Sequence, residues 1–344
     1  MINLKQFLIL LVGLAISPVF GQTAIEYMET ISGETKAIQK DMWDYTSTVA
    51  HGKSARKVEK RRSELLKTSL EAIQKVKAMP AFDGSTAYRD SVVDFLQVNY
   101  TVLKVDYAEI VNLETSSQSS FEKMEAYLKA QELASNKMRE SAQMVRNQQK
   151  VFAENNNIDL LETDDALSQK MKRASEVYGY YNGVYLVFFK NFLQETDLLN
   201  SMQNQNLTGI KNNSEKLSRF AEEGLEKLSA INPFEGDASL VVACKEMLTF
   251  YKDEAENQMK AVIDYHEKNK SFAAIQEEFE QIKEKNRTQE DVDRFNNAVT
   301  AVNEAGELFN ATVAALNKER EAKLNNWNKV VAKFTDSHVP KGKA

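Results

Sequence analysis

The residues that could perform chemistry are few and widely separated in this sequence. It contains one cysteine, Cys244, and three histidines, His51, His266 and His338. No two histidines have the i, i+4 spacing of a helical metal site, and no Glu-x-x-His motif occurs. Neither a glycine-rich phosphate loop nor a Gly-x-Ser-x-Gly nucleophile motif is present. The sequence therefore predicts no catalytic residues, no metal site, no cofactor and no enzymatic activity.

A tyrosine-rich segment from residue 178 to residue 189 is the first candidate for a binding surface. The residues of interest in it are Tyr180, Tyr181, Tyr185 and Phe189. Tyrosine combines an apolar ring with a hydroxyl group that forms hydrogen bonds, so it suits both cores and binding surfaces. A helical stripe accounts for most of the segment but leaves Tyr180 and Phe189 on other faces. Two interpretations stay open, namely packing within or between helical bundles and a surface for a partner or ligand.

A basic cluster is the second candidate, formed by Lys57, Lys60, Arg61 and Arg62. It lies in an acidic protein, with 44 basic and 50 acidic side chains and a net charge of -6. Such a cluster is typical of a solvated helix face, and it also suits contact with an anionic lipid or a surface polysaccharide. The acidic balance of the whole chain argues against binding to nucleic acid.

The elements that must position these residues recur along the chain. Residues 70–85 align without a gap with residues 222–237, at a constant offset of 152 positions. Each aligned stretch contains a short loop, and the loop residues that recur are Phe82, Gly84, Phe234 and Gly236. A repeat at this distance indicates a duplicated domain rather than a short solenoid unit. We expect Ser85 and Asp237 to cap the helices that follow the two loops.

The helices expected after the two loops carry apolar stripes in the same phase. The stripes are Tyr88, Val92, Phe95, Leu96, Leu103, Tyr107 and Ile110, and Leu240, Cys244, Met247, Leu248, Ala255, Met259 and Val262. Cys244 takes the place of Val92, so we expect a buried, unreactive thiol. What recurs is therefore a burial face and not a set of reactive groups.

The predicted fold class is all-α, with two tandem up-and-down helical bundles and long, coiled-coil-like helices. Only four prolines and twelve glycines interrupt the chain, and its short loops join antiparallel helices. The predicted organisation is a signal peptide at 1–21, a first bundle at 22–157, a second bundle at 158–339 and a short basic tail at 340–344.

The first residues have the pattern of an export signal. Lys5 precedes an apolar run that ends at Phe20, and we expect cleavage after Gly21. No cysteine stands directly after the run, where a lipid anchor would need one, so we expect no lipid anchor. The longest apolar stretch of the mature chain, Val184 to Phe189, is far shorter than the ~20 residues of a membrane span. The expected location is therefore the periplasm or the cell exterior.

With this signal, the paired loops and the matched helices, the chain resembles an uncharacterised family of exported, all-helical surface or periplasmic proteins of Gram-negative bacteria. The resemblance implies no catalytic residues. We expect a non-enzymatic envelope protein that contacts another protein or an envelope polymer, with its oligomeric state left open. One alternative is a periplasmic protein that binds a small ligand or a metal near Tyr180, Tyr181 and Tyr185. A remoter alternative is a helical pore-forming toxin, which would need an apolar hairpin that the sequence does not show.

Overall fold

The computed structural model describes residues 21–51, 55–106, 120–160 and 166–342, and these residues form an all-α protein. Pairing of the β type within these ranges is limited to two isolated bridges, Phe82–Ser85 and Phe234–Asp237. The all-α prediction is confirmed. The expected signal peptide lies outside the described residues except for Gly21, which begins the first helix. Among the described helices, none combines the length and apolar character that crossing a lipid bilayer requires.

The chain divides into two compact units. Unit 1 comprises Met1–Asn182 and Lys333–Ala344, and unit 2 comprises Gly183–Ala332. Two helices contribute to both units, namely α6 (Ala166–Gln203) and α10 (Gln289–His338). The compact units therefore divide inside α6 and α10, whereas the two bundles predicted from the sequence meet between residues 157 and 158, after the polar stretch 154–157.

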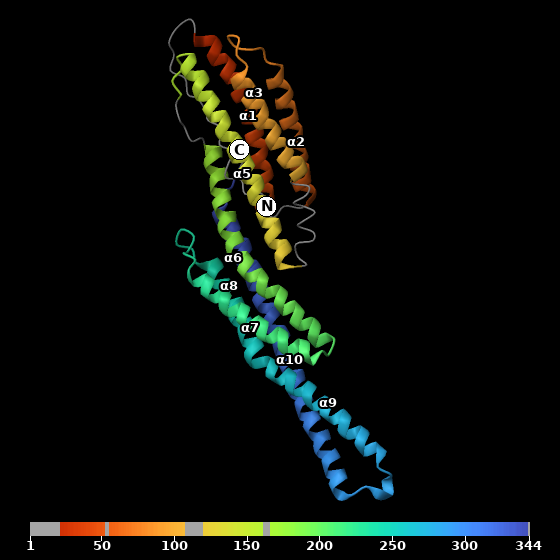
Figure 1. Cartoon of the computed structure of the whole chain (residues 1–344). Helices are drawn as coiled ribbons and strands as arrows, with labels where there is room; N and C mark the ends of the chain where they lie inside the picture. Colours follow the sequence, from red (N-terminus) through yellow and green to blue (C-terminus); the bar gives the residue numbers. More distant parts are fainter. Residues whose placement is uncertain (1–20, 52–54, 107–119, 161–165, 343–344) are drawn as a thin grey trace. The chain divides into compact units, whose positions relative to one another are not determined.

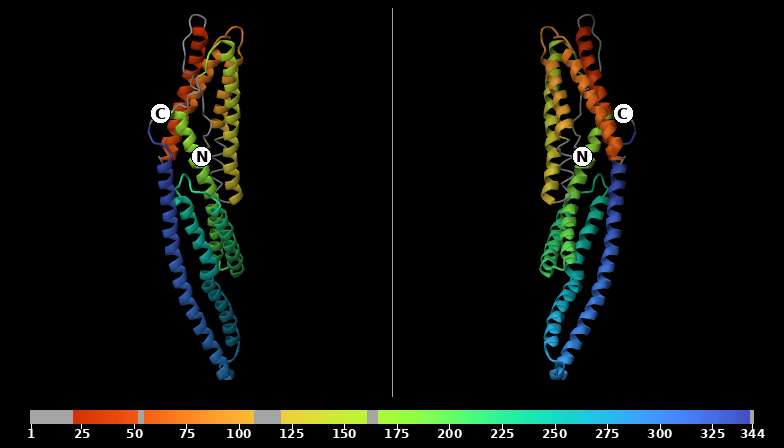
Figure 2. Two further views of the ribbon diagram at one scale, coloured as in Figure 1. Left: turned by 90° about the vertical axis from the view of Figure 1, so that its left-hand side faces the viewer. Right: turned by 90° about the vertical axis from the view of Figure 1, so that its right-hand side faces the viewer.

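Unit 1 is a bundle built around helices from the first half of the chain. These are α1 (Gly21–Ala50), α2 (Ala55–Ala78), α3 (Ala87–Thr101) with the π-helical turn η1 (Val102–Asp106), and α5 (Phe121–Asn155). The four α-helices run side by side in Figure 1 and, coloured red to yellow, in both views of Figure 2. Trp43 and Phe95 are among its largest fully buried side chains. At one end, Phe82 of the repeat loop lies 5.3 Å from Tyr27 and 5.2 Å from Phe152, measured between ring centroids.

Unit 2 contains the rest of α6 and α10 together with the intervening helices. These are α7 (Leu207–Ser229), α8 (Ser239–Asp253), the π-helical turn η2 (Glu254–Gln258), α9 (Met259–Gln281) and the short 3-10 helix η3 (Glu284–Asn286). Helices α7 and α8 approach closely at Gly224, where an added Cβ atom would lie 2.4 Å from Leu248 Cδ2. Phe188 of α6 stacks on Trp327 of α10 at 4.6 Å, which joins these two helices within the core.

Elements of the two units recur at the offset of 152 found in the sequence. Helix α3 and η1 match α8 and η2 residue for residue in their bounds. The loops match as well, because Gly84 and Gly236 both have positive φ angles, 77° and 88°, and so do the residues before them. Two successive residues with positive φ form the centre of a type I′ turn, and glycine adopts a positive φ without steric cost. The internal duplication remains a prediction, and these matched elements support it.

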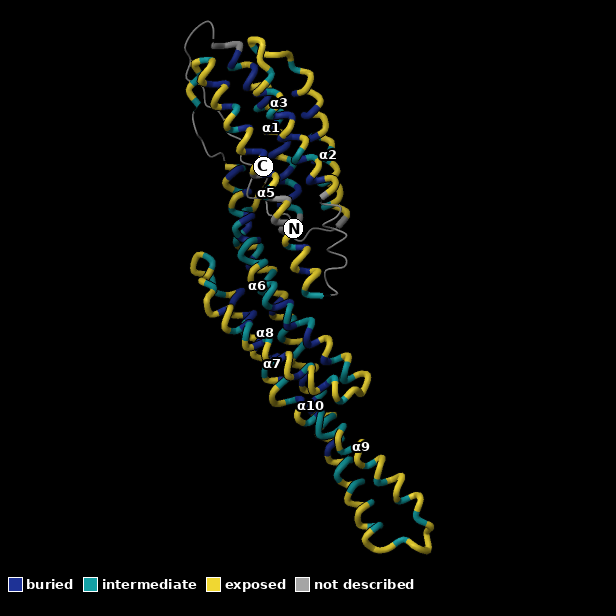
Figure 3. Tube along the Cα trace, viewed as in Figure 1, coloured by how far each residue is buried: buried dark blue, intermediate teal, exposed yellow. Residues whose placement is uncertain are grey.

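Part of unit 2 contains no buried residue. In α9 the buried residues are Met259 and Val262, and the first buried residue of α10 is Ala305. Every residue from 263 to 304 is exposed or half-buried, and this hairpin of α9 and α10 has no dark blue segment in Figure 3. We call residues 263–304 the arm. Its helices contact each other through Phe279 and Phe295, whose rings stack at 4.6 Å.

Several local expectations differ from the structure. Apolar spacing alone predicts a helix from Asp237 to about Asn269 and a separate piece from about Phe272 to Lys285, but α9 runs without interruption to Gln281. Ser85 and Asp237 are not the N-caps, since those positions are Thr86 and Ala238. Asp237 Oδ1 instead accepts a hydrogen bond from Ser239 N at 2.8 Å. Because Ser239 is the first residue of α8, this Asx turn connects the loop to the beginning of the helix.

Candidate functional site

The four aromatic candidates divide between the two units and take part in packing. Tyr180 and Tyr181 belong to unit 1, where the Tyr180 ring stacks on Phe334 at 5.7 Å. Tyr185 and Phe189 belong to unit 2 and stack on each other at 5.6 Å. Phe189 is buried and Tyr185 is half-buried, and burial raises the pKa of the Tyr185 hydroxyl. Within their own units, Tyr180, Tyr185 and Phe189 thus contact other rings.

The basic candidates lie on α2 beside carboxylates of the same bundle. Arg61 Nη1 lies 2.8 Å from Glu64 Oε2, and Arg62 Nη2 lies 2.9 Å from Glu59 Oε1. Lys60 Nζ is 3.8 Å from Glu64 Oε1, and Lys57 is exposed. Because most of these cations already have a carboxylate partner one turn away, the geometry is that of a solvated helix face.

The side chains that could act as a nucleophile or bind a metal ion are poorly placed for either role. Cys244 is buried, and burial raises the pKa of its thiol to about 12, so the reactive thiolate is scarce at neutral pH. His266 packs edge-on against Phe309, and burial lowers its pKa. In the part of the chain that the structure describes, no group of three or more potential ligands is arranged to hold a metal ion.

A buried charged cluster in unit 2 is the most unusual arrangement of polar groups in the described chain. Arg320 of α10 donates from Nε to Glu195 Oε1 of α6 and from Nη2 to Glu254 Oε1 of η2, both at 2.5 Å. The side chains of Arg320, Glu195 and Glu254 are 12%, 2% and 0% exposed. We call these three residues the charged cluster. It joins three elements of unit 2, and its burial keeps it out of reach of a dissolved substrate.

Two carboxyl groups share one guanidinium in the charged cluster, so one negative charge is left over when both are ionised. Burial, together with the neighbouring charge of Glu195, raises the pKa of Glu254 to about 8. Burial also raises the pKa of Glu195, although Arg320 opposes that shift. Glu254 Oε2 and the Tyr251 hydroxyl are buried and have no hydrogen-bond partner among the described residues. The cluster can therefore hold a proton on Glu254 at neutral pH and fix α10 against α6 and η2.

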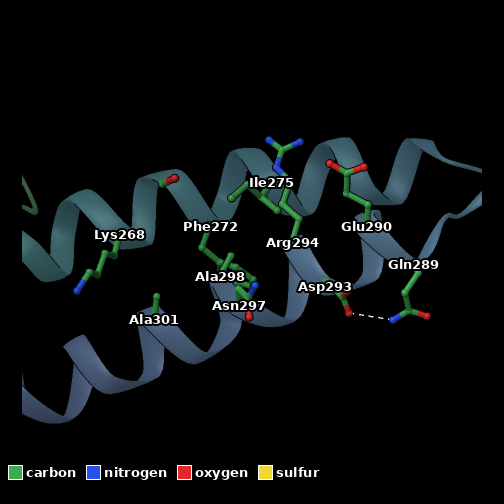
Figure 4. A pocket seen from close by; sticks show the side chains of 11 residues that line it. Lys268, Phe272, Ile275, Gln289, Glu290, Asp293, Arg294, Asn297, Ala298 and Ala301 are labelled. Atoms are coloured by element: carbon green, nitrogen blue, oxygen red, sulfur yellow. Dashed lines mark hydrogen bonds between the residues drawn. The ribbon is translucent and has the colours of Figure 1, made fainter.

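The arm carries an open groove between its two helices, shown in Figure 4. Its volume is about 770 Å³. Phe272 and Ile275 of α9 and Ala298 and Ala301 of α10 supply its apolar surface. The polar residues along it are Lys268, Ser271, Gln289, Glu290, Asp293, Arg294 and Asn297. A groove of this kind can accept an elongated apolar element such as one face of a helix.

The start of α10 beside the groove is locally well defined. Thr288 Oγ1 accepts a hydrogen bond from Asp291 N at 3.2 Å, and Asp291 Oδ2 accepts one from Thr288 N at 2.8 Å. This reciprocal pair is a capping box, which satisfies two backbone donors at the beginning of a helix. Thr288, followed by the acidic residues Glu290 and Asp291, has the sequence pattern of an N-cap, and these two hydrogen bonds confirm that role. Arg287 further covers the ring of Phe279 at 4.3 Å.

Neither the charged cluster nor the groove was predicted from the sequence. Each charged residue stands within an apolar stripe, since Glu254 follows Met247 and Tyr251 at helical spacing, and Arg320 lies between Leu316 and Leu324. A charged residue at the helical spacing of buried apolar residues was the sequence signal that could have revealed the cluster. For the groove, the signal was the closely spaced alanines of α10 opposite Phe272 and Ile275.

Comparison with protein-family models, curated proteins and solved structures gives no match to this chain.

Proposed function

We propose that this chain is a non-enzymatic, exported protein that acts through surface contacts, and that the arm is its contact surface. The observation that supports the proposal most strongly is the burial pattern of residues 263–304. Their apolar side chains are only half covered, although α9 and α10 extend the helices of a well-packed core. The hairpin adds little buried apolar surface to the folded protein, so the stability of the fold does not explain its presence.

We infer that the partner is a protein rather than a polymer. The groove of the arm presents apolar side chains along two parallel lines on α9 and α10, a geometry that suits a helix. Its mixed rim, with carboxylates, cations and amides, adds directional contacts of the kind found at the edges of protein interfaces. Export remains part of the proposal because residues 1–21 have the pattern of a signal.

Site-specific photo-crosslinking in the native cells tests the proposed function. A benzophenone amino acid replaces Ile275 in the groove, and a matched variant carries it at Leu70, an exposed apolar residue of α2 in unit 1. We expect a discrete protein adduct from position 275 and none from position 70. The absence of any adduct from the arm, or equal labelling from both positions, would contradict the proposal.

The exported location has a separate test. The mature protein, isolated from fractionated cells, is sequenced at its N-terminus by mass spectrometry. We expect the chain to begin at Gln22 and to be recovered outside the cytoplasm. Recovery from the cytoplasm with residues 1–21 attached would overturn the proposal of export and would leave the role of the arm standing.

A further inference from the structure

We infer that the groove of the arm binds a basic amphipathic helix of a partner protein, an inference that rests on the proposed function of the arm. The groove lies between α9 and α10, with Phe272 and Ile275 on one side and Ala298 and Ala301 on the other. Within each pair the residues are one helical turn apart, which is the spacing with which a third helix can interdigitate. The small side chains of α10 allow its backbone to come near.

The arm has room for such a helix because it consists of only two helices, α9 and α10. Two helices can cover one side of each other and leave the adjoining faces open. Phe279 and Phe295 already fill the contact between α9 and α10, with ring centroids 4.6 Å apart. Phe272 and Ile275 remain half-buried beside them and line the groove. A third helix would cover these side chains and complete a three-helix layer.

The charges on the rim of the groove indicate the charge of the partner. Lys268 Nζ lies 2.8 Å from Asp264 Oδ2, and Arg294 Nη2 lies 2.7 Å from Glu278 Oε2, so carboxylates of the arm compensate both cations. Glu290 and Asp293 also line the groove. Asp293 Oδ1 accepts a hydrogen bond from Gln289 Nε2 at 2.8 Å, as Figure 4 shows, but among the described residues neither carboxylate has a cation within ion-pair distance.

The arm as a whole has the same bias, with ten acidic and six basic side chains between residues 263 and 304. Lysine or arginine beside the apolar face of the partner would complement this surface.

The same charges disfavour two other occupants. A second copy of the arm would bring a second set of uncompensated carboxylates against Glu290 and Asp293, and like charges at an interface oppose association. An anionic membrane surface would meet the same repulsion. A basic helix is the occupant that satisfies both the apolar groove and its acidic rim.

Binding of designed peptides to the mature full-length chain tests the inference. The probe is a fluorescent amphipathic peptide of leucine and lysine, followed by anisotropy. Two reference peptides replace lysine by glutamate or scramble the leucine–lysine sequence so that no apolar face forms. We expect saturable binding of the amphipathic basic peptide only. Equal binding of either reference peptide would overturn the inference.

Variants of the chain locate the binding. Ala301→Glu places a charge against the apolar face of the probe and should weaken binding by about tenfold or more, because an unpaired charge becomes desolvated. The pair Glu290→Lys and Asp293→Lys should weaken it by about fivefold. The matched control, Glu277→Lys and Glu304→Lys, makes the same change in net charge outside the groove and should bind as the wild type does. Circular dichroism verifies that each variant is folded.

The outcomes separate this inference from the proposed function. If the control pair weakens binding as much as the groove pair, the attraction is non-specific and the inference fails. It also fails if sedimentation shows self-association lost in Ala301→Glu, or if phosphatidylglycerol vesicles bind with the same dependence on the variants. If no peptide binds but position 275 crosslinks in cells, the inference fails and the proposed function stands. If crosslinking is silent as well, both fail.

Discussion

Residues 87–106 and 239–258 have the same backbone and different chemistry. In each segment a 15-residue α-helix continues into a five-residue π-helical turn. The first π turn begins with the buried Val102, and the second begins with the buried Glu254. At the same offset, Trp43 in the core of unit 1 corresponds to Glu195 in unit 2. Apolar side chains thus occupy two positions in unit 1 that carboxyl groups occupy in unit 2.

The difference shows that the charges are not what makes the π turn. Val102, an apolar residue, begins a turn of the same length, so a carboxyl group at that position is not required for the turn. The carboxyl groups of unit 2 instead meet Arg320, which belongs to α10, the helix that also forms one side of the arm. We therefore interpret the charged cluster as the attachment that fixes α10, and with it the base of the arm, to the core of unit 2.

Removal of the central cation should have the largest effect. Arg320→Met leaves the buried Glu195 without its counter-ion and Glu254 without its hydrogen-bond donor, and breaking a buried pair in this way costs about 3–5 kcal/mol. We expect that loss in the free energy of unfolding measured by urea denaturation at neutral pH. A change below about 1 kcal/mol would mean that the cluster does not hold α10.

The comparison with unit 1 supplies the control for this variant. Adding Glu195→Leu and Glu254→Val to Arg320→Met makes the site apolar, as it is around Val102. Replacing a whole buried charged group by apolar residues is often neutral or stabilising. The triple variant should therefore recover most of the stability that the single variant loses, and a further loss would contradict the proposed equivalence of the two sites.

The proton on Glu254 predicts a dependence of stability on pH. Its pKa rises from 4.5 to about 8 on folding, so the folded protein binds the proton more tightly than the unfolded chain does. The free energy of unfolding should consequently fall as pH rises from about 5 to 8, by about 3–4 kcal/mol in total. In Glu254→Gln, which keeps an acceptor for Arg320 without the titration, most of that fall should disappear. Urea denaturation at several pH values measures both, and an identical slope in the variant would exclude this assignment.

The two repeat loops should respond equally to the same substitution. Gly84 and Gly236 have φ angles of 77° and 88°, which cost a residue with a Cβ atom about 1 kcal/mol. Neither glycine has an atom within 4 Å of the position of an added Cβ, so the cost is conformational and not steric. Gly84→Ala and Gly236→Ala should each lower the midpoint of thermal unfolding by a few degrees. A large difference between them would show that the two loops are not equivalent.

A substitution in the groove should have the smallest effect on stability. Ala301 is half-buried in an arm without a core, so Ala301→Glu should change the free energy of unfolding by less than about 0.5 kcal/mol. Ala221→Glu is the contrasting variant, because Ala221 is fully buried in α7 and a carboxylate there should be strongly destabilising. Urea denaturation of both variants measures the contrast. Similar losses in the two would show that the arm belongs to the folded core.

Much of the fold could be predicted because apolar periodicity depends on local sequence. The stripe through Tyr88, Val92 and Phe95 located α3, and the stripe through Leu240 and Cys244 located α8 at the same offset. The π turns could not be predicted in this way, because one extra residue in a turn leaves no composition signal. The division of the two units inside α6 and α10 could not be predicted either, because it depends on the packing of segments distant in sequence.

The candidate sites were harder to predict, since both depend on three-dimensional neighbours. Glutamate and arginine on a helix usually indicate a solvent-exposed face. Only the three-dimensional contacts among Glu195, Glu254 and Arg320 show that these side chains are buried together. The tyrosine-rich segment drew attention by composition, yet Tyr180 and Tyr185 stack on neighbouring rings. The half-covered groove of the arm required the actual pairing of α9 with α10.

The central claim is that the arm makes the contacts of this protein with its partner. The most direct test replaces residues 269–298 by a short Gly-Ser turn and compares what is crosslinked to the shortened and the full-length chain in the native cells. We predict that the partner adducts of the full-length chain disappear while circular dichroism shows the helices of the core intact. Retention of the same adducts by the shortened chain would contradict the account.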